Sequence, residues 1–157
     1  MKQNKLNPKS EAKVKKGFAA FFISMLPALG IYMFTNMMFA DINATNPEES
    51  VIMWTFVVSW VAFGYWFYYK TDSIKRMGYR TLIILAIMSF IFPLTILIAG
   101  GKASINETNP FAMAGGIIGT GIAFIFFAVV GILFGLAFSI SAFFLGRSLN
   151  NETKNNQ

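Results

Sequence analysis

The chain has 157 residues, of which 55% are hydrophobic and only 13% are charged, a mixture outside that of an ordinary soluble domain. It contains no cysteine and no histidine, which excludes disulfides, thiolate chemistry and the commonest metal ligand. Its net charge of +6 does not indicate a nucleic-acid binder, because the basic residues lie between apolar blocks instead of covering one folded surface. The composition therefore predicts a membrane protein.

The chain begins with a lysine-rich arm, residues 1–16, which has few large apolar side chains. Such a segment buries too little surface to offset the entropy of ordering, so we expect a disordered basic arm on the cytoplasmic side. A secretory signal peptide is the alternative. The apolar run that follows, residues 17–40, has 24 residues, longer than the about 7 to 15 of a signal sequence, and therefore predicts a first membrane-spanning helix.

Four runs contain no acidic or basic residue, and each exceeds the about 18 residues that predict a membrane span: 17–40, 51–69, 81–101 and 111–146. The last run would form a helix of about 54 Å, against a hydrocarbon core of about 30 Å. We therefore expect an irregular or interfacial segment at 112–121 and a regular span at about 122–145. The predicted fold is an all-α, four-helix transmembrane domain over residues 17–146, followed by a disordered tail at 147–157.

Basic residues gather on one side of these predicted spans. Among 13 lysines and arginines, Lys102 is the exception that falls in a loop on the other side. The positive-inside rule then predicts that both termini are cytoplasmic, in a plasma membrane such as the inner membrane of a bacterium.

One six-residue stretch occurs twice, as INATNP at 42–47 and as INETNP at 105–110. Each copy lies between two predicted helices, and Asn-Pro favours a turn or a helix start. A proline also interrupts the first and third runs, at Pro27 and Pro93. We interpret the chain as two tandem helical hairpins, a parallel repeat about an axis along the membrane normal, with chance similarity of two asparagine-rich turns as the alternative.

The two prolines lie near the middle of their predicted helices, and each frees the carbonyl four residues earlier. Interrupted helices at matching places in two halves mark midplane binding sites in transporters. A hypothetical midplane site for a small neutral solute therefore consists of Ser24, Pro27, Ser89, Pro93 and Thr95. The alternative is that membrane helices tolerate proline because nearby hydroxyls or local 3₁₀ geometry satisfy the freed carbonyls.

Small residues recur in steps of three and four along the last run, which lets a neighbouring backbone approach closely. The predicted helix-packing residues are Gly116, Gly119, Gly131, Gly135, Ser139 and Ala142. The packing partner is a helix of the same chain or of another subunit, and the first is favoured because short hairpins pack against themselves.

Aromatic residues gather in the second run, and they predict a membrane-interface belt: Trp54, Tyr65, Trp66, Tyr68 and Tyr69. The alternative is an aromatic cage that binds an organic cation through cation–π attraction.

The chain contains no recognisable catalytic constellation, since without histidine or cysteine only loop carboxylates and lysines remain as bases. The absence of charged residues from the apolar runs argues against proton coupling and charged substrates. We therefore expect a non-enzymatic multi-pass protein without cofactor or metal, an accessory, assembly or immunity-type component that acts through helix packing in a homo-oligomer or with a larger membrane protein. The alternative is a small oligomeric carrier or channel for a neutral solute, with its site at the Pro27 and Pro93 kinks.

Overall fold

The structure is a computed structural model that describes residues 8–39, 48–105 and 108–155. These residues form four helices and no strand: α1 (Pro8–Phe39), α2 (Glu48–Lys70), α3 (Ile74–Ile105) and α4 (Pro110–Asn155). Each helix contains a segment that is long and apolar enough to cross a membrane. The predicted all-helical fold with four candidate spans is confirmed, and it indicates an integral membrane protein.

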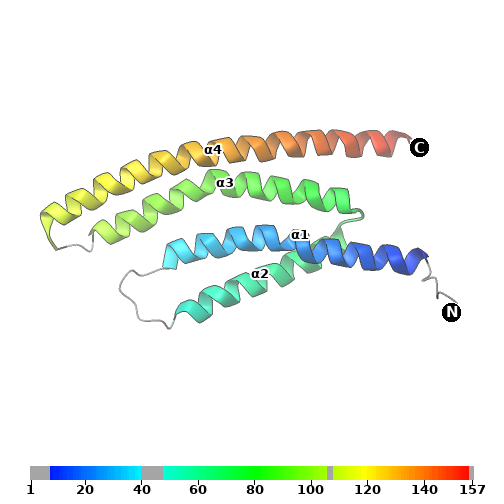
Figure 1. The fold of residues 1–157 in the computed structure, drawn as a ribbon, viewed down its shortest axis with the longest axis horizontal. Helices are drawn as coiled ribbons and strands as arrows, with labels where there is room; N and C mark the ends of the chain where they lie inside the picture. Colours follow the sequence, from blue (N-terminus) through cyan, green and yellow to red (C-terminus); the bar gives the residue numbers. More distant parts are fainter. Residues whose placement is uncertain (1–7, 40–47, 106–107, 156–157) are drawn as a thin grey trace, which may run out of the picture.

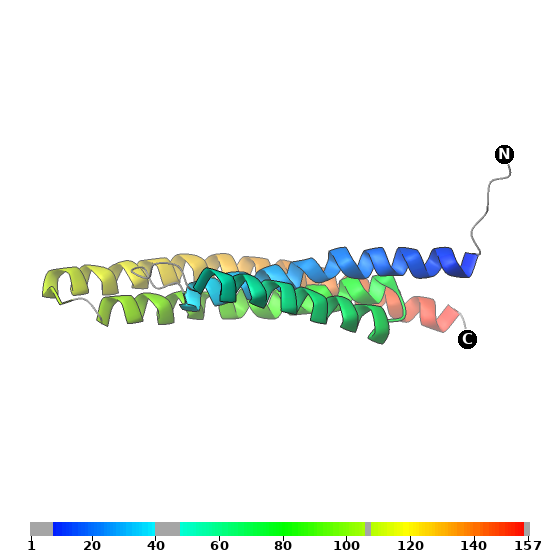
Figure 2. The same ribbon diagram turned by 90° about the horizontal axis from the view of Figure 1, so that it is seen from below.

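The four helices lie side by side in an open row (Figure 1). α1 and α3 are neighbours at the centre, α2 packs against α1 on one flank, and α4 packs against α3 on the other. Seen from below, the row is a shallow layer with no enclosed centre (Figure 2). Because successive helices run in opposite directions, the start of α1, the α2–α3 turn and the end of α4 share one end of the row, the termini end.

The two central helices match in length and in the position of their proline. α1 and α3 each have 32 residues, and Pro27 and Pro93 each stand at the twentieth residue of their helix. Both helices continue through the proline.

α1 begins earlier than the sequence predicts. Its first residue is Pro8, so residues 8–16 of the arm that we expected to be disordered are helical. Proline suits the first position of a helix, an i,i+4 ion pair of 2.6 Å joins Glu11 to Lys15, and extending an existing helix costs little. Residues 1–7, the rest of the arm, lie outside the described residues.

α4 is one continuous helix of 46 residues, which corrects two expectations. Residues 112–121 are regular helix and not an irregular segment, and the tail expected to be disordered from residue 147 is helical through Asn155. The helix start is well capped, since Asn109 Oδ1 accepts the Phe111 N–H at 3.0 Å and Pro110 occupies the first position. At the other end an ion pair joins Glu152 to Lys75 of α3.

The last two residues of the second copy of the repeated motif therefore begin a helix: Asn109 caps α4, and Pro110 is its first residue. The first copy, residues 42–47, lies outside the described residues.

The row buries few large side chains. A small cluster near the termini end joins Ala20 of α1, Phe67 of α2 and Met77 of α3. Most of the large apolar side chains on all four helices are exposed in the isolated chain. In a membrane, lipid or another protein covers such surfaces, so the stability of the fold depends on its apolar surroundings.

Candidate functional site

An apolar hollow of about 490 Å³ is lined by residues of α1, α3 and α4. Its wall includes Gly30 and Phe34 from α1, Ser89 from α3, and Gly131 and Phe134 from α4. Among the residues that form this wall, Ser89 alone has a polar side chain. The hollow therefore suits an apolar occupant better than a polar one.

The proline of α3 lies beside this hollow, and α4 covers the carbonyl that it frees. Pro93 has no N–H to donate to the Ser89 carbonyl. Gly131 of α4 is buried against that carbonyl: a Cβ at Gly131 would overlap the Ser89 oxygen and lie 3.1 Å from Pro93 Cγ. The missing side chain thus lets a glycine Cα–H approach the oxygen, a weak contact that partly replaces the lost hydrogen bond.

The predicted midplane residues do not converge on one site. Ser24 Oγ and Thr95 Oγ1 each donate to a carbonyl three residues earlier, at 2.9 and 2.6 Å, and Ser89 Oγ donates to one four residues earlier, at 2.8 Å. Ser89 lines the hollow, whereas Ser24 lies between α1 and α2, and Thr95 contacts Met37 Sδ at 3.8 Å. Pro27 is also buried, away from the wall of the hollow.

The contact between α1 and α2 resembles the one between α3 and α4. A Cβ at Gly64 of α2 would lie 3.4 Å from Ser24 Oγ, so in each hairpin a glycine of the outer helix approaches a serine of the inner helix. The first contact is with a side-chain oxygen three residues before Pro27, and the second is with a backbone oxygen four residues before Pro93. Trp60 Nε1 donates to the Phe21 carbonyl at 2.8 Å, and the two rings lie 4.5 Å apart. Sequence reasoning missed Gly64 and Trp60, although a glycine within an aromatic run is a signal of close packing.

The predicted packing residues of α4 divide into two groups. Gly131, Gly135 and Ala142 are buried, and a Cβ at Gly135 would lie 2.7 Å from Phe90 Cζ of α3. Ser139 is exposed, Gly116 is half-buried, and a Cβ at Gly119 would meet nothing within 4 Å. The glycine pair of the GILFG sequence therefore faces α3 of the same chain.

The aromatic residues of α2 lie toward both ends of the helix. Trp54 is exposed near its start, whereas Tyr65, Trp66, Tyr68 and Tyr69 gather at the termini end, where the Tyr65 and Tyr69 rings lie 4.5 Å apart. Two of these rings contact cations of the chain itself. Lys16 Nζ lies 5.4 Å from the Tyr68 ring centroid, and Arg80 Cζ lies 5.1 Å from that of Trp66.

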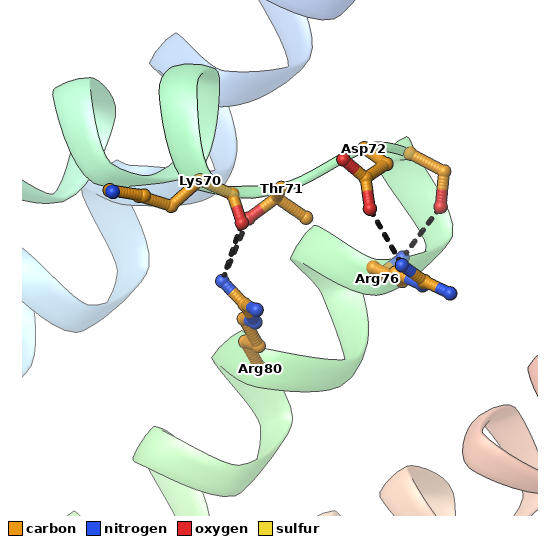
Figure 3. A network of polar contacts seen from close by, with 6 residues as sticks. Lys70, Thr71, Asp72, Arg76 and Arg80 are labelled. Atoms are coloured by element: carbon orange, nitrogen blue, oxygen red, sulfur yellow. Dashed lines mark hydrogen bonds and ion pairs between the residues drawn. The ribbon is translucent and has the colours of Figure 1, made fainter.

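The α2–α3 turn contains a polar network that the sequence analysis did not anticipate (Figure 3). Arg80 Nη1 donates to the Lys70 carbonyl at 3.1 Å and to Thr71 Oγ1 at 3.2 Å, which satisfies the end of α2. Arg76 Nη1 pairs with Asp72 Oδ2 at 2.7 Å. The spacing of four residues from Asp72 to Arg76 predicts the ion pair, whereas no spacing rule predicts the contacts of Arg80 with Lys70 and Thr71.

No group of three or more Asp, Glu, His or Cys residues that could hold a metal occurs within residues 8–39, 48–105 and 108–155. In the hollow, the one hydroxyl already donates to its own helix. Comparison of the chain with models of protein families, with curated proteins and with solved structures found no match.

Proposed function

We propose that the chain is a non-enzymatic component of a membrane assembly and acts by packing its helices against a larger membrane protein. The observation that supports this proposal is the open row. α4 packs extensively against α3 alone, and the hollow between α1, α3 and α4 opens beside it without a helix of the described chain to fill it. A transmembrane helix of a partner matches the apolar wall of this hollow.

A carrier or channel for a neutral solute is the alternative, and one observation favours it. The hollow adjoins Pro93, near the middle of α3, which is the depth at which transporters bind their substrates. Solute sites, however, place several polar groups where they converge, and here Ser24 and Thr95 lie apart from Ser89.

We also propose that the row arose by duplication of one hairpin. In the order α2–α1–α3–α4, each flank consists of the second helix of a hairpin, and the first helix of that hairpin lies next to it toward the centre. The equivalent positions of Pro27 and Pro93 and the paired serine–glycine contacts support the same relation. The pseudo-two-fold axis would pass between α1 and α3 along the membrane normal. By the positive-inside rule, the lysine-rich termini end would face the cytoplasm, and the membrane would be a plasma membrane.

The proposed assembly can be tested by crosslinking from the hollow. Phe134 is exposed in its wall, and Leu136, two residues on, is exposed about 200° away on the other side of α4. A photoreactive residue at Phe134 should give an adduct with one protein of defined mass, and the same residue at Leu136 should give less of it. Native mass spectrometry of the complex, extracted gently with its lipid, should show the same partner.

Adducts with lipid alone at both positions, together with the native mass of a single chain, would refute the proposed assembly. A ring of this chain alone that takes up a neutral solute in liposomes, with uptake lost in Pro93→Ala, would establish the carrier instead.

A further inference from the structure

A second hollow, of about 560 Å³, lies between α3 and α4 at the termini end. Arg76, Tyr79 and Arg80 line it from α3, and Arg147 and Asn150 line it from α4. Its volume lies within the range of about 300 to 1,000 Å³ found for ligand sites. Unlike the apolar hollow, it is lined by three guanidinium groups.

α3 and α4 approach each other closely at the residues next to Arg80 and Arg147. A Cβ at Gly146 would lie 3.0 Å from Tyr79 Cε2, so glycine lets α4 lie against the tyrosine ring. Arg147 follows Gly146 directly, and the close approach therefore holds its backbone beside the arginines of α3.

The acidic residues near this hollow do not neutralise it. Asp72 pairs with Arg76, and Glu152 pairs with Lys75, which leaves two guanidinium charges without a carboxylate. Arg80 uses Nη1 for the α2–α3 turn but carries further N–H donors, since a guanidinium has five. Arg147 is exposed and forms no hydrogen bond or ion pair with any residue that the structure describes.

The depth of the arginines matches that of lipid phosphates. Arg80 directly precedes the charge-free run 81–101, and Arg147 directly follows the run 111–146. Both guanidinium groups therefore belong at the boundary of the hydrocarbon core. Phe143, one turn deeper on α4 and also in the wall, is 66% exposed and offers apolar surface to an acyl chain.

We propose that this hollow binds the headgroup phosphate of an anionic phospholipid. The guanidinium of Arg147, with those of Arg76 and Arg80, donates to the phosphate oxygens, a geometry that arginine forms in bidentate fashion. The acyl chain lies against Phe143. The combination of guanidinium groups at the boundary with an apolar side chain one turn deeper favours a lipid over a free anion, and basic pockets between helices bind such headgroups in other membrane proteins.

The test uses the full chain in zwitterionic detergent micelles, titrated with phosphatidylglycerol, and native mass spectrometry reads the fraction of chain with lipid bound. Phosphatidylcholine should bind more weakly. Arg147→Gln should weaken phosphatidylglycerol binding about fivefold, the effect of one basic residue near the membrane surface, and Arg147→Lys should restore part of it. Because Arg147 is exposed and unpaired in the described chain, the thermal unfolding of Arg147→Gln should be unchanged in phosphatidylcholine.

The matched control is Lys102→Gln, which removes one exposed charge at the opposite end of the row and should leave binding unchanged. An equal loss in Lys102→Gln would show diffuse attraction to net charge and overturn the site. Displacement of phosphatidylglycerol by millimolar inorganic phosphate would identify a free-anion site and overturn the lipid assignment. Equal binding of phosphatidylglycerol and phosphatidylcholine would overturn both the arginine site and the assignment of an anionic lipid to it.

Discussion

The contact between Gly131 and the Ser89 carbonyl allows the α3–α4 interface to be tested by a single methyl group. In Gly131→Ala the new Cβ would overlap a backbone oxygen, which cannot turn aside as a flexible side chain does, and would lie 3.1 and 3.4 Å from Cγ and Cδ of Pro93. α3 and α4 must therefore separate locally. Overpacking of this kind costs about 1 to 3 kcal/mol.

Gly119→Ala is the matched control on the same helix. Its Cβ would meet nothing within 4 Å, so this variant keeps only the helix-propensity gain of alanine over glycine, about 1 kcal/mol. Gly131→Ala has the same gain, which therefore cancels when the two variants are compared. Gly131→Ala should be less stable than Gly119→Ala by about 1 to 3 kcal/mol.

The assay is reversible unfolding in mixed micelles by titration with SDS, followed by the helical circular dichroism signal. Both variants and the parent chain are measured at the same detergent composition, so that the difference in unfolding free energy belongs to the substitution. Equal stability of the two alanine variants would refute the close contact of Gly131 with the Ser89 carbonyl.

Two further predictions concern the termini end and the topology. Thr81 and Thr71 are both buried, but the Thr81 hydroxyl has no partner among the described residues, whereas Thr71 Oγ1 accepts a hydrogen bond from Arg80. In the same SDS titration, Thr81→Val should therefore raise the free energy of unfolding by about 1 kcal/mol, and Thr71→Val should lower it by about as much. A change of the same sign in both variants, or a lowered free energy in Thr81→Val with a raised one in Thr71→Val, would contradict this assignment of partners. Because the chain has no cysteine, a single introduced cysteine reports the side of the membrane on which it lies. Thr108→Cys should react with an impermeant thiol reagent from outside intact cells, and Asp72→Cys should react only after lysis. The reverse labelling pattern would show that the topology is opposite to the one proposed.

The number and the approximate positions of the helices could be predicted, because an apolar run of this length has no alternative to helix in a membrane. The ends of the helices could not be predicted in the same way. The limits of the charge-free runs predict where the hydrocarbon core ends, whereas the helices end where caps and ion pairs allow. Pro8 at the start of α1 and the Lys75–Glu152 pair beside the end of α4 are examples.

The small residues of α4 show why spacing alone identified only part of the packing surface, Gly131 and Gly135 but not Gly119. Gly119 and Gly131 are 12 residues apart, and at 100° per residue they point about 120° away from each other around α4. One stripe of small residues therefore cannot face α3 along its whole length. The choice of Gly131 over Gly119 depends on how α4 is rotated against α3, which no local pattern records.

The midplane hydroxyls were predictable as residues but not as a site. Serine and threonine within a helix can donate to a carbonyl three or four residues earlier, and Ser24, Ser89 and Thr95 all do so. The sequence cannot tell whether such a hydroxyl faces a solute or its own backbone, because the spacing is the same in both cases.

The contact at Gly131 also has a consequence for biogenesis. As α3 leaves the insertion machinery, the Ser89 carbonyl lacks its helical donor at mid-height in the lipid, where an unsatisfied backbone group costs several kcal/mol. α4 follows after a short connection and brings Gly131 against that oxygen. Lateral release of α3 into lipid is therefore more favourable together with α4, and the second hairpin is expected to enter the bilayer as a pair.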